Sequence, residues 1–158
     1  MALTTMVVPQ LEFVFAAEAA LADPIQIGQT HEGARRIIPI LDGHFAGPAI
    51  KGSFVSVGAA DWQRTRTDGV TQAEATYAIQ TDDGVIIQVE NFGLRHGPAD
   101  VMQRLVAGED VDPANYYFRT NPRFKAPTGK YDWLNRSIFV ASGARYRNSI
   151  KLWFFAVK

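Results

Sequence analysis

The chain has 158 residues, of which 47% are hydrophobic and 20% charged, so intrinsic disorder is excluded and one domain over residues 1–158 is expected. Cysteine is absent, which excludes disulfides, thiolate metal sites and cysteine nucleophiles. The net charge is zero and no apolar run approaches the ~20 residues of a membrane-spanning helix, so neither nucleic acid nor a membrane is an expected partner. A signal peptide begins with a positively charged region, but no Lys or Arg precedes Arg35. We therefore expect a cytoplasmic protein.

Charge is distributed unevenly along the chain. Only one of the 16 acidic residues, Asp132, follows residue 118, whereas nine of the 16 basic residues do. A basic nucleic-acid face is one explanation. The preferred explanation is a closed sheet in which basic late strands lie beside acidic early ones, as cross-strand neighbours.

Alternating apolar residues predict strands around residues 11–15, 72–80, 85–90 and 146–154. Turn signals separate the predicted strands, and those at Asp68-Gly69 and 81–84 indicate hairpins. Further turn signals are Asp42-Gly43, Gly47-Pro48 and Ser142-Gly143.

One segment has helical spacing instead. Apolar residues recur at intervals of three and four between Pro98 and Gly108, which predicts a short helix that closes one mouth of the sheet. About eight to ten strands and one short helix predict an all-β fold, a single antiparallel barrel or sandwich. Of the two we expect a β-barrel with the architecture of lipocalins or streptavidin. Such a barrel has room for side chains or one small ligand.

The densest pattern lies between residues 33 and 63. Four glycines recur there, at Gly43, Gly47, Gly52 and Gly58, as expected where strands bend or a ligand meets the backbone. Asp61-Trp62 follows them. A carboxylate beside an indole is partly desolvated, so Asp61 is a candidate general acid or base and Trp62 a candidate ligand contact. Alternatively, Asp61 caps a turn and Trp62 fills the core.

These residues carry a resemblance to a known family. The motifs, in chain order, are Ile37-Ile38-Pro39, Gly43-His44-Phe45-Ala46-Gly47-Pro48, Gly58-Ala59-Ala60-Asp61-Trp62-Gln63, Asp68-Gly69-Val70, Thr81-Asp82-Asp83-Gly84, Tyr117-Phe118-Arg119-Thr120 and Trp133-Leu134-Asn135. From about Phe13 onward the chain resembles domain of unknown function 3237, a bacterial and fungal family. Asp42 and Lys51 depart from its pattern, where glycine and arginine are expected. The resemblance implies a small antiparallel barrel that usually self-associates and has no known cofactor, and some fungal relatives are linked to polyketide ring formation.

Two further residues are candidates for catalysis. Arg36 shares strand parity with Ile38 and Ile40, so it is expected to point inward, where it could hold a carboxylate, enolate or phenolate. Its alternative is a buried ion pair with an acidic neighbour. His44 follows a turn glycine near a strand end and is the third catalytic candidate; its alternative is an ordinary hydrogen-bonded histidine.

Four more residues are candidates for ligand binding. Glu90 and Asn91 end a strand rich in valine and isoleucine, and they either line the pocket or face water. Tyr117 and Trp133 either wall a site for an aromatic ligand or serve as core or subunit contacts. The three histidines have no close metal-ligand spacing and no nucleotide motif occurs, so neither a metal nor another cofactor is expected.

The last segment, residues 151–158, is apolar on both faces of a predicted strand. A strand of this kind is buried on both sides, so we expect its outer face to be covered by the N-terminal segment or by another subunit of a dimer or larger homo-oligomer.

Two functional hypotheses follow. The first is a cofactor-independent enzyme of the lyase, isomerase or cyclase type, in which Asp61 moves a proton on an aromatic or polyketide-like carbonyl compound. The alternative is a non-catalytic barrel that binds or carries a hydrophobic metabolite. A filled barrel whose motifs serve only folding is a third possibility.

Overall fold

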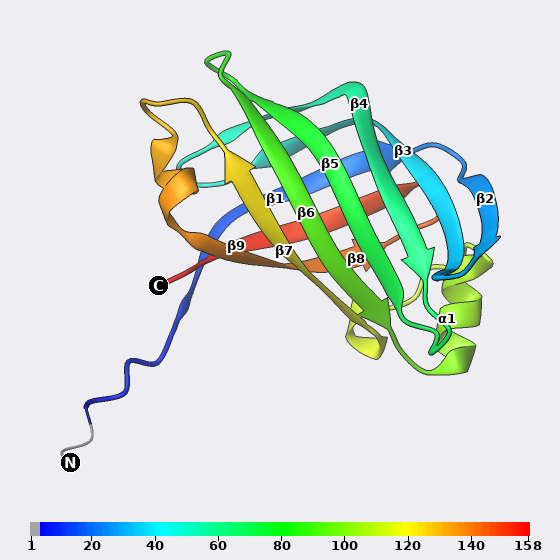
Figure 1. The fold of residues 1–158 in the computed structure, drawn as a ribbon. Coiled ribbons are helices and arrows are strands. Elements are labelled where there is room, and N and C mark those ends of the chain that lie inside the picture. The colour runs from blue at the N-terminus through cyan, green and yellow to red at the C-terminus, as the bar shows by residue number, and fades with distance from the viewer. Residues whose placement is uncertain (1–3) are drawn as a thin grey trace.

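The computed structural model describes residues 4–158, which form a closed antiparallel barrel (Figure 1). The strands are β1 (Leu11–Leu21), β2 (Ile25–Thr30), β3 (Gly33–Ala46), β4 (Lys51–Thr65), β5 (Thr71–Thr81), β6 (Ile86–His96), β7 (Tyr117–Lys125), β8 (Ile138–Arg145) and β9 (Ser149–Val157). The helices are α1 (Ala99–Val106) and the 3-10 turns η1 (Pro113–Asn115) and η2 (Asp132–Arg136). None of the helices between residues 4 and 158 is long and apolar enough to cross a bilayer.

Eight strands make the barrel, and pairing of β1 with both β9 and β3 closes it. The short strand β2 lies outside this ring and pairs only with β3. The predicted fold class, an all-β barrel with one short helix, is therefore confirmed. The predicted helix is also present as α1, at one end of the barrel.

The two predicted hairpins are confirmed, because turns at residues 67–69 and 82–83 join β4 to β5 and β5 to β6. Two predicted turns are wrong. Ser142-Gly143 lies inside β8, and Asp42-Gly43 lies inside β3. A Cβ at Gly143 would lie 2.5 Å from the ring of Phe118, so this glycine makes room for an inward aromatic side chain and not for a turn.

The lumen is filled at one end and hollow at the other. The rings of Phe15 and Phe154 stack with centroids 4.3 Å apart, and Phe124 and Phe139 pack edge to face at 4.9 Å. These rings, with the neighbouring Phe45, plug the half of the barrel that is covered by η2. Toward α1 the inward side chains of several strands are small, and they leave space. Those side chains are Ala17, Ala19, Ala73 and Ala75.

A bulge in β4 decides which face of that strand carries the polar residues. The β4–β5 register shifts between Val55 and Ala60, and Gly58 within it has φ 72°. Before the bulge the side chain of Phe54 faces the lumen, and after it those of Asp61 and Gln63 do. From Val55 to Ala60 β4 advances five residues while β5 advances two, so β4 carries three extra residues. An odd number of extra residues reverses the alternation of the strand, and so it turns Asp61 inward.

The uneven charge distribution is explained by barrel closure. Glu18 of β1 lies opposite Lys151 of β9, and the Glu12 carboxylate lies 3.6 Å from the ammonium of Lys158. Acidic early and basic late segments are thus cross-strand neighbours.

We predict that Gly47→Ala destabilises the barrel far more than Gly84→Ala. A Cβ at position 47 would lie 1.9 Å from the carbonyl oxygen of Val14, at the β1–β3 closure, whereas a Cβ at Gly84 meets nothing within 4 Å. Gly84 has φ 89°, so alanine there costs about 1–2 kcal/mol of backbone strain. The clash at position 47 is expected to cost about 3 kcal/mol or more in free energy of unfolding, measured by urea denaturation. Equal losses in the two variants would show that closeness of β1 and β3 does not limit stability.

Candidate functional site

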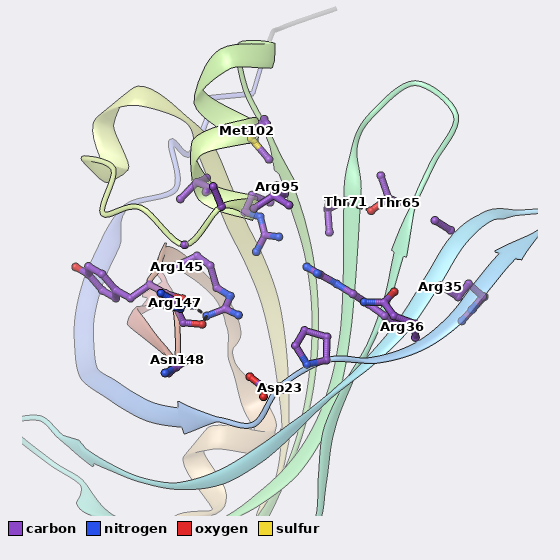
Figure 2. Close-up of a pocket in the computed structure, with 18 of the residues that line it drawn as sticks. Asp23, Arg35, Arg36, Thr65, Thr71, Arg95, Met102, Arg145, Arg147 and Asn148 are labelled. Atoms are coloured by element: carbon purple, nitrogen blue, oxygen red, sulfur yellow. Dashed lines mark hydrogen bonds between the residues drawn. The ribbon is translucent and has the colours of Figure 1, made fainter.

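A cavity of about 450 Å³ opens at the α1 end of the barrel. Figure 2 shows Arg36, Arg95 and Arg145 pointing into it from β3, β6 and β8. Met102 and Leu105 of α1 supply apolar lining on one side. We call this space the mouth cavity. Arg35, Arg147 and Asp23 also line it. The cavity thus combines five arginines and one aspartate with an apolar wall, as expected where a small organic anion binds.

A hydrogen-bonded chain of side chains runs along the lumen wall from β4 to β3. The amide nitrogen of Gln63 donates to Asp61 Oδ2 at 2.7 Å. Its amide oxygen accepts from Arg36 Nε at 2.9 Å and from Arg36 Nη2 at 2.8 Å. The second carboxylate oxygen, Asp61 Oδ1, accepts from the backbone N–H of Glu74 in β5 at 2.8 Å. The chain therefore holds Asp61 and Arg36 in fixed orientations and joins them through one amide.

Burial raises the pKa of Asp61 above its ordinary value. The hydrogen bonds from Gln63 and Glu74, and the charges of Arg95 and Arg36, oppose this shift without cancelling it. Asp61 consequently binds a proton more tightly than an exposed aspartate does. A carboxyl group of this kind is suited to take up and release a proton during a reaction.

Arg95 is a buried cation, with only 6% of its surface exposed. Burial, followed by the charges of Arg145 and Arg36, lowers its pKa to about 10, so it is still charged at neutral pH. Within the described residues its Nε atom has no hydrogen-bond partner, and its guanidinium lies over the Phe118 ring at 5.5 Å.

Arg145 is anchored by the backbone of the β8–β9 turn. Its Nη1 donates to the carbonyl oxygens of Arg147 at 3.2 Å and of Ser149 at 3.0 Å, and also to that of Tyr146. Its backbone N–H donates to the hydroxyl of Tyr116 at 2.9 Å. These bonds leave the guanidinium preorganised toward the cavity before any ligand arrives.

Arg145 also lines a second, smaller cavity of about 50 Å³ deeper in the lumen. Asp61, Tyr77, Asn91 and Thr120 line it as well. Their buried atoms Tyr77 Oη, Asn91 Oδ1 and Thr120 Oγ1 have no hydrogen-bond partner of good geometry within residues 4–158. Burial raises the pKa of the Tyr77 hydroxyl, so it stays protonated as a donor. This inner cavity holds no more than a water molecule or a small ligand group, so of these two spaces the mouth cavity is the one with room for a larger ligand.

The structure brings three of the sequence-derived candidates to the lumen: Asp61, Arg36 and Asn91. The strand neighbours Trp62 and Glu90 lie on the outer face, because alternate residues of a strand point to opposite sides. Trp62 is 48% exposed, and Glu90 pairs there with Lys125 at 2.7 Å. The carboxylate and the indole are thus on opposite faces, and the desolvation of Asp61 comes from the lumen.

The remaining candidates lie elsewhere. His44 is exposed on β3, opposite Ser53, on the far side of the register shift from Arg36. Tyr117 is exposed and stacks on His96 with centroids 4.8 Å apart. Trp133 packs near Phe139 at the plugged end of the barrel. We therefore build the candidate site without these three residues.

Sequence reasoning missed Gln63, Tyr77, Arg95 and Arg145, which complete the site. A signal existed for Arg95, because it shares period-two parity with Val89 and Asn91 of the same strand. Arg145 has the same relation to Ala141 and Gly143. Nothing in the local pattern indicates that these arginines meet at one end of the barrel, because that depends on how the strands pair. In the part of the chain that the structure describes, no three His, Asp or Glu side chains gather as a metal site would require.

Comparison with known proteins identifies relatives that cover most of this chain. A curated relative from Bradyrhizobium diazoefficiens, named only as a UPF0311 protein, is 45% identical over 139 residues, which cover 88% of this chain and 90% of the relative. The crystal structure of a conserved protein of unknown function from Rhodopseudomonas palustris has a TM-score of 0.93 and 38% identity, and the match covers 97% of this chain and 100% of that one. A beta-barrel like protein from Acinetobacter baumannii has a TM-score of 0.84 and 35% identity, with 98% and 99% covered.

A more distant structure shares the fold. It is described as an enzyme from Penicillium herquei, and it matches with a TM-score of 0.73 at 21% identity, covering 99% of this chain and 100% of that one. The family model described as a protein of unknown function (DUF3237) matches residues 9–157. The resemblance noted in the sequence is thereby confirmed: this chain belongs to the DUF3237 family.

Proposed function

We propose that this protein is a cofactor-independent enzyme that moves a proton on an aromatic or polyketide-like carbonyl compound held in the mouth cavity, with its reacting carbon reaching the inner cavity that Asp61 lines. The observation that carries the proposal is Asp61, a desolvated carboxylate fixed by Gln63 and Glu74 beside three arginines. The Penicillium herquei protein, described as an enzyme, has the same fold, so a barrel of this shape is compatible with catalysis.

Different residues would carry out the steps of such a reaction. Asp61 takes a proton from the carbon next to the substrate carbonyl, and the electron pair of that C–H bond moves onto the carbonyl oxygen as an enolate. The N–H groups of Arg36 and Arg145 stabilise this oxyanion. Return of the proton to another carbon completes an isomerisation. Alternatively, the enolate carbon attacks a second carbonyl carbon of the substrate and closes a ring, the π electron pair of that C=O bond moves onto its oxygen, and the resulting alkoxide takes the proton back from Asp61. Met102 and Leu105 of α1 exclude water from that side.

A second candidate function is a barrel that binds or carries a hydrophobic metabolite without changing it. The largely apolar lining of the inner cavity supports it, since Ile38, Ile40 and Leu152 surround that space. In that case Asp61 and the arginines only orient the ligand. The two functions differ in whether Asp61 exchanges a proton with the ligand.

We predict that the protein accelerates hydrogen–deuterium exchange at the carbon acid of aromatic 1,3-diketones and hydroxyaryl ketones in D₂O, followed by proton NMR. Asp61→Asn keeps the shape but cannot accept the proton, so exchange is expected to slow by about 100-fold or more. Glu74→Gln is the matched control, because only its backbone N–H contacts Asp61 and its side chain is exposed. Ligand binding without any exchange would favour the carrier, and full exchange in Asp61→Asn would exclude Asp61 as the base.

We predict that this exchange depends on pH through Asp61. The base acts in its ionised form, so the rate rises with pH and levels off above the pKa of Asp61. Because burial raises that pKa, the half-maximal pH lies above the value of about 3.9 of a free aspartate. The residual rate of Asp61→Asn is expected to show no such step. A wild-type midpoint at or below the free-aspartate value would contradict the role of burial.

We also propose that a second copy of the chain covers the outer face of β1, β9 and β8. Two apolar rows cross these strands through register pairs, the first formed by Leu11, Val157 and Ile138 and the second by Phe13, Phe155 and Val140. Ile138 is 67% exposed. Residues 4–9 extend away from the barrel before the start of β1, and they carry Met6, Val7 and Val8, which are all exposed (Figure 1). A second copy offers these apolar segments complementary surfaces, as a twofold interface requires.

We predict that sedimentation velocity finds the wild type as a dimer or larger assembly, and that Ile138→Glu shifts it to monomer, because a desolvated carboxylate in the apolar rows opposes association. Thr76→Glu, on the exposed outer face of β5, is the control and is expected to sediment like the wild type. A monomeric wild type at micromolar concentration would contradict the proposal.

A further inference from the structure

Three of the arginines that line the mouth cavity have no counterion in direct contact. None of the ion pairs formed within residues 4–158 includes Arg36, Arg95 or Arg145. Asp61 reaches Arg36 only through Gln63. A buried cation without a bonded anion is costly, so an arrangement of this kind indicates that a ligand supplies the missing charge.

Donors are left for such a ligand. Arg36 uses Nε and Nη2 for Gln63, which leaves Nη1 without a partner among the bonds of the described residues. Arg95 Nε is buried and has none. Arg145 is fixed through Nη1 alone. Three preorganised guanidinium groups with unused N–H donors around one cavity match the planar, two-oxygen geometry of an anionic group.

The charge balance at the site favours a carboxylate over a phosphate as the anionic group of the substrate. Five arginines line the mouth cavity, and one of them, Arg35, pairs with Glu32 at 2.8 Å. The other four, which are the three above and Arg147, face two carboxylates, Asp23 of the same lining and Asp61 of the inner cavity, so an excess of two positive charges remains. An enolate formed during the proposed reaction accounts for one of them, and a permanent carboxylate on the substrate accounts for the other. A phosphate monoester carries about −1.5 to −2 by itself and would leave the developing enolate without compensation.

We infer that the substrate is a carboxylic acid, whose carboxylate binds Arg95 together with Arg145 while its apolar part lies against Met102 and Leu105 of α1. This inference rests on the proposed function and goes beyond it, because it names a second group that the substrate must carry. The carbonyl oxygen to be converted then lies toward Arg36 and Asp61. At neutral pH Arg95 keeps the charge that this binding needs.

The test is a calorimetric binding comparison that does not require catalysis. We expect 1-hydroxy-2-naphthoate to bind the wild type roughly 10- to 100-fold more tightly than 1-hydroxy-2-naphthamide, because the amide keeps the shape but not the charge. Arg95→Met is expected to reduce this preference to less than about threefold, and Arg95→Lys to retain part of it. Should Arg95→Met not fold, Arg145→Met is the second variant, expected to lower the preference as well.

Matched controls separate the possible outcomes. Arg123→Met, an exposed arginine on the outer face of β7, is expected to leave the preference unchanged. 1-Naphthyl phosphate is expected to bind more weakly than the naphthoate, and tighter binding of the phosphate would overturn the assignment of a carboxylate. Equal binding of acid and amide by the wild type would overturn the inference altogether.

Failure of this inference is distinguishable from failure of the proposed function. Asp61→Asn is expected to keep the preference for the acid, since it removes only a negative charge. If the acid preference is present but no deuterium exchange occurs, the carboxylate site stands and the protein is a carrier. If Asp61-dependent exchange occurs without an acid preference, the proton-transfer function stands and the substrate class is wrong.

Discussion

Closure of the sheet by β1 against β3 is the constraint on which the rest of the structure depends. β1 pairs with β9 on one side and must also approach β3 closely on the other. The glycines of β3 and of the turn after it permit that approach. A Cβ at Gly43 would lie 2.4 Å from the carbonyl oxygen of Glu18, and one at Gly47 would lie 1.9 Å from that of Val14. Once the ring is closed, every inward side chain shares one lumen, and the sizes of these side chains decide where space remains.

The lumen is graded from large to small side chains. Phenylalanines from β1, β3, β7, β8 and β9 fill one end, so η2 and Trp133 cover a packed core there. Toward the other end the inward positions of β1 and β5 carry alanines, and β4, β6 and β8 contribute polar groups. Packing of the filled end makes the barrel rigid. Because the same strands continue to the hollow end, they hold Asp61 and the arginines there in fixed positions.

The electrostatics of the hollow end have one physical origin, which is desolvation. Burial raises the pKa of Asp61 and lowers the pKa of Arg95, so each group is pushed toward its neutral form, and their mutual attraction restores part of the charge. Gln63 separates the negative carboxylate from a positive guanidinium, because its side-chain amide forms hydrogen bonds with Asp61 and with Arg36 at the same time. An acid and a base that neutralised each other in a direct ion pair would leave neither free for a ligand. The amide spacer keeps both accessible.

The sequence by itself determined the fold class and the identity of the central carboxylate. Period-two alternation, two hairpin turns and one segment of helical spacing sufficed for an antiparallel barrel or sandwich with one short helix, because these signals are local, and the family resemblance favoured the barrel. The family motifs drew attention to Asp61, and the parity of Arg36 with Ile38 indicated its direction.

Only the tertiary structure decided which side chains share the site. The Gly58 bulge sets the face of Asp61, and the same alternation that turns Asp61 and Asn91 inward places Trp62 and Glu90 outside. Arg95 and Arg145 lie 50 residues apart in the chain and meet because β6 and β8 both flank β7. Local sequence patterns record the direction of a side chain along its own strand. Which strands become neighbours, and at which register, is fixed by long-range pairing and closure of the whole sheet.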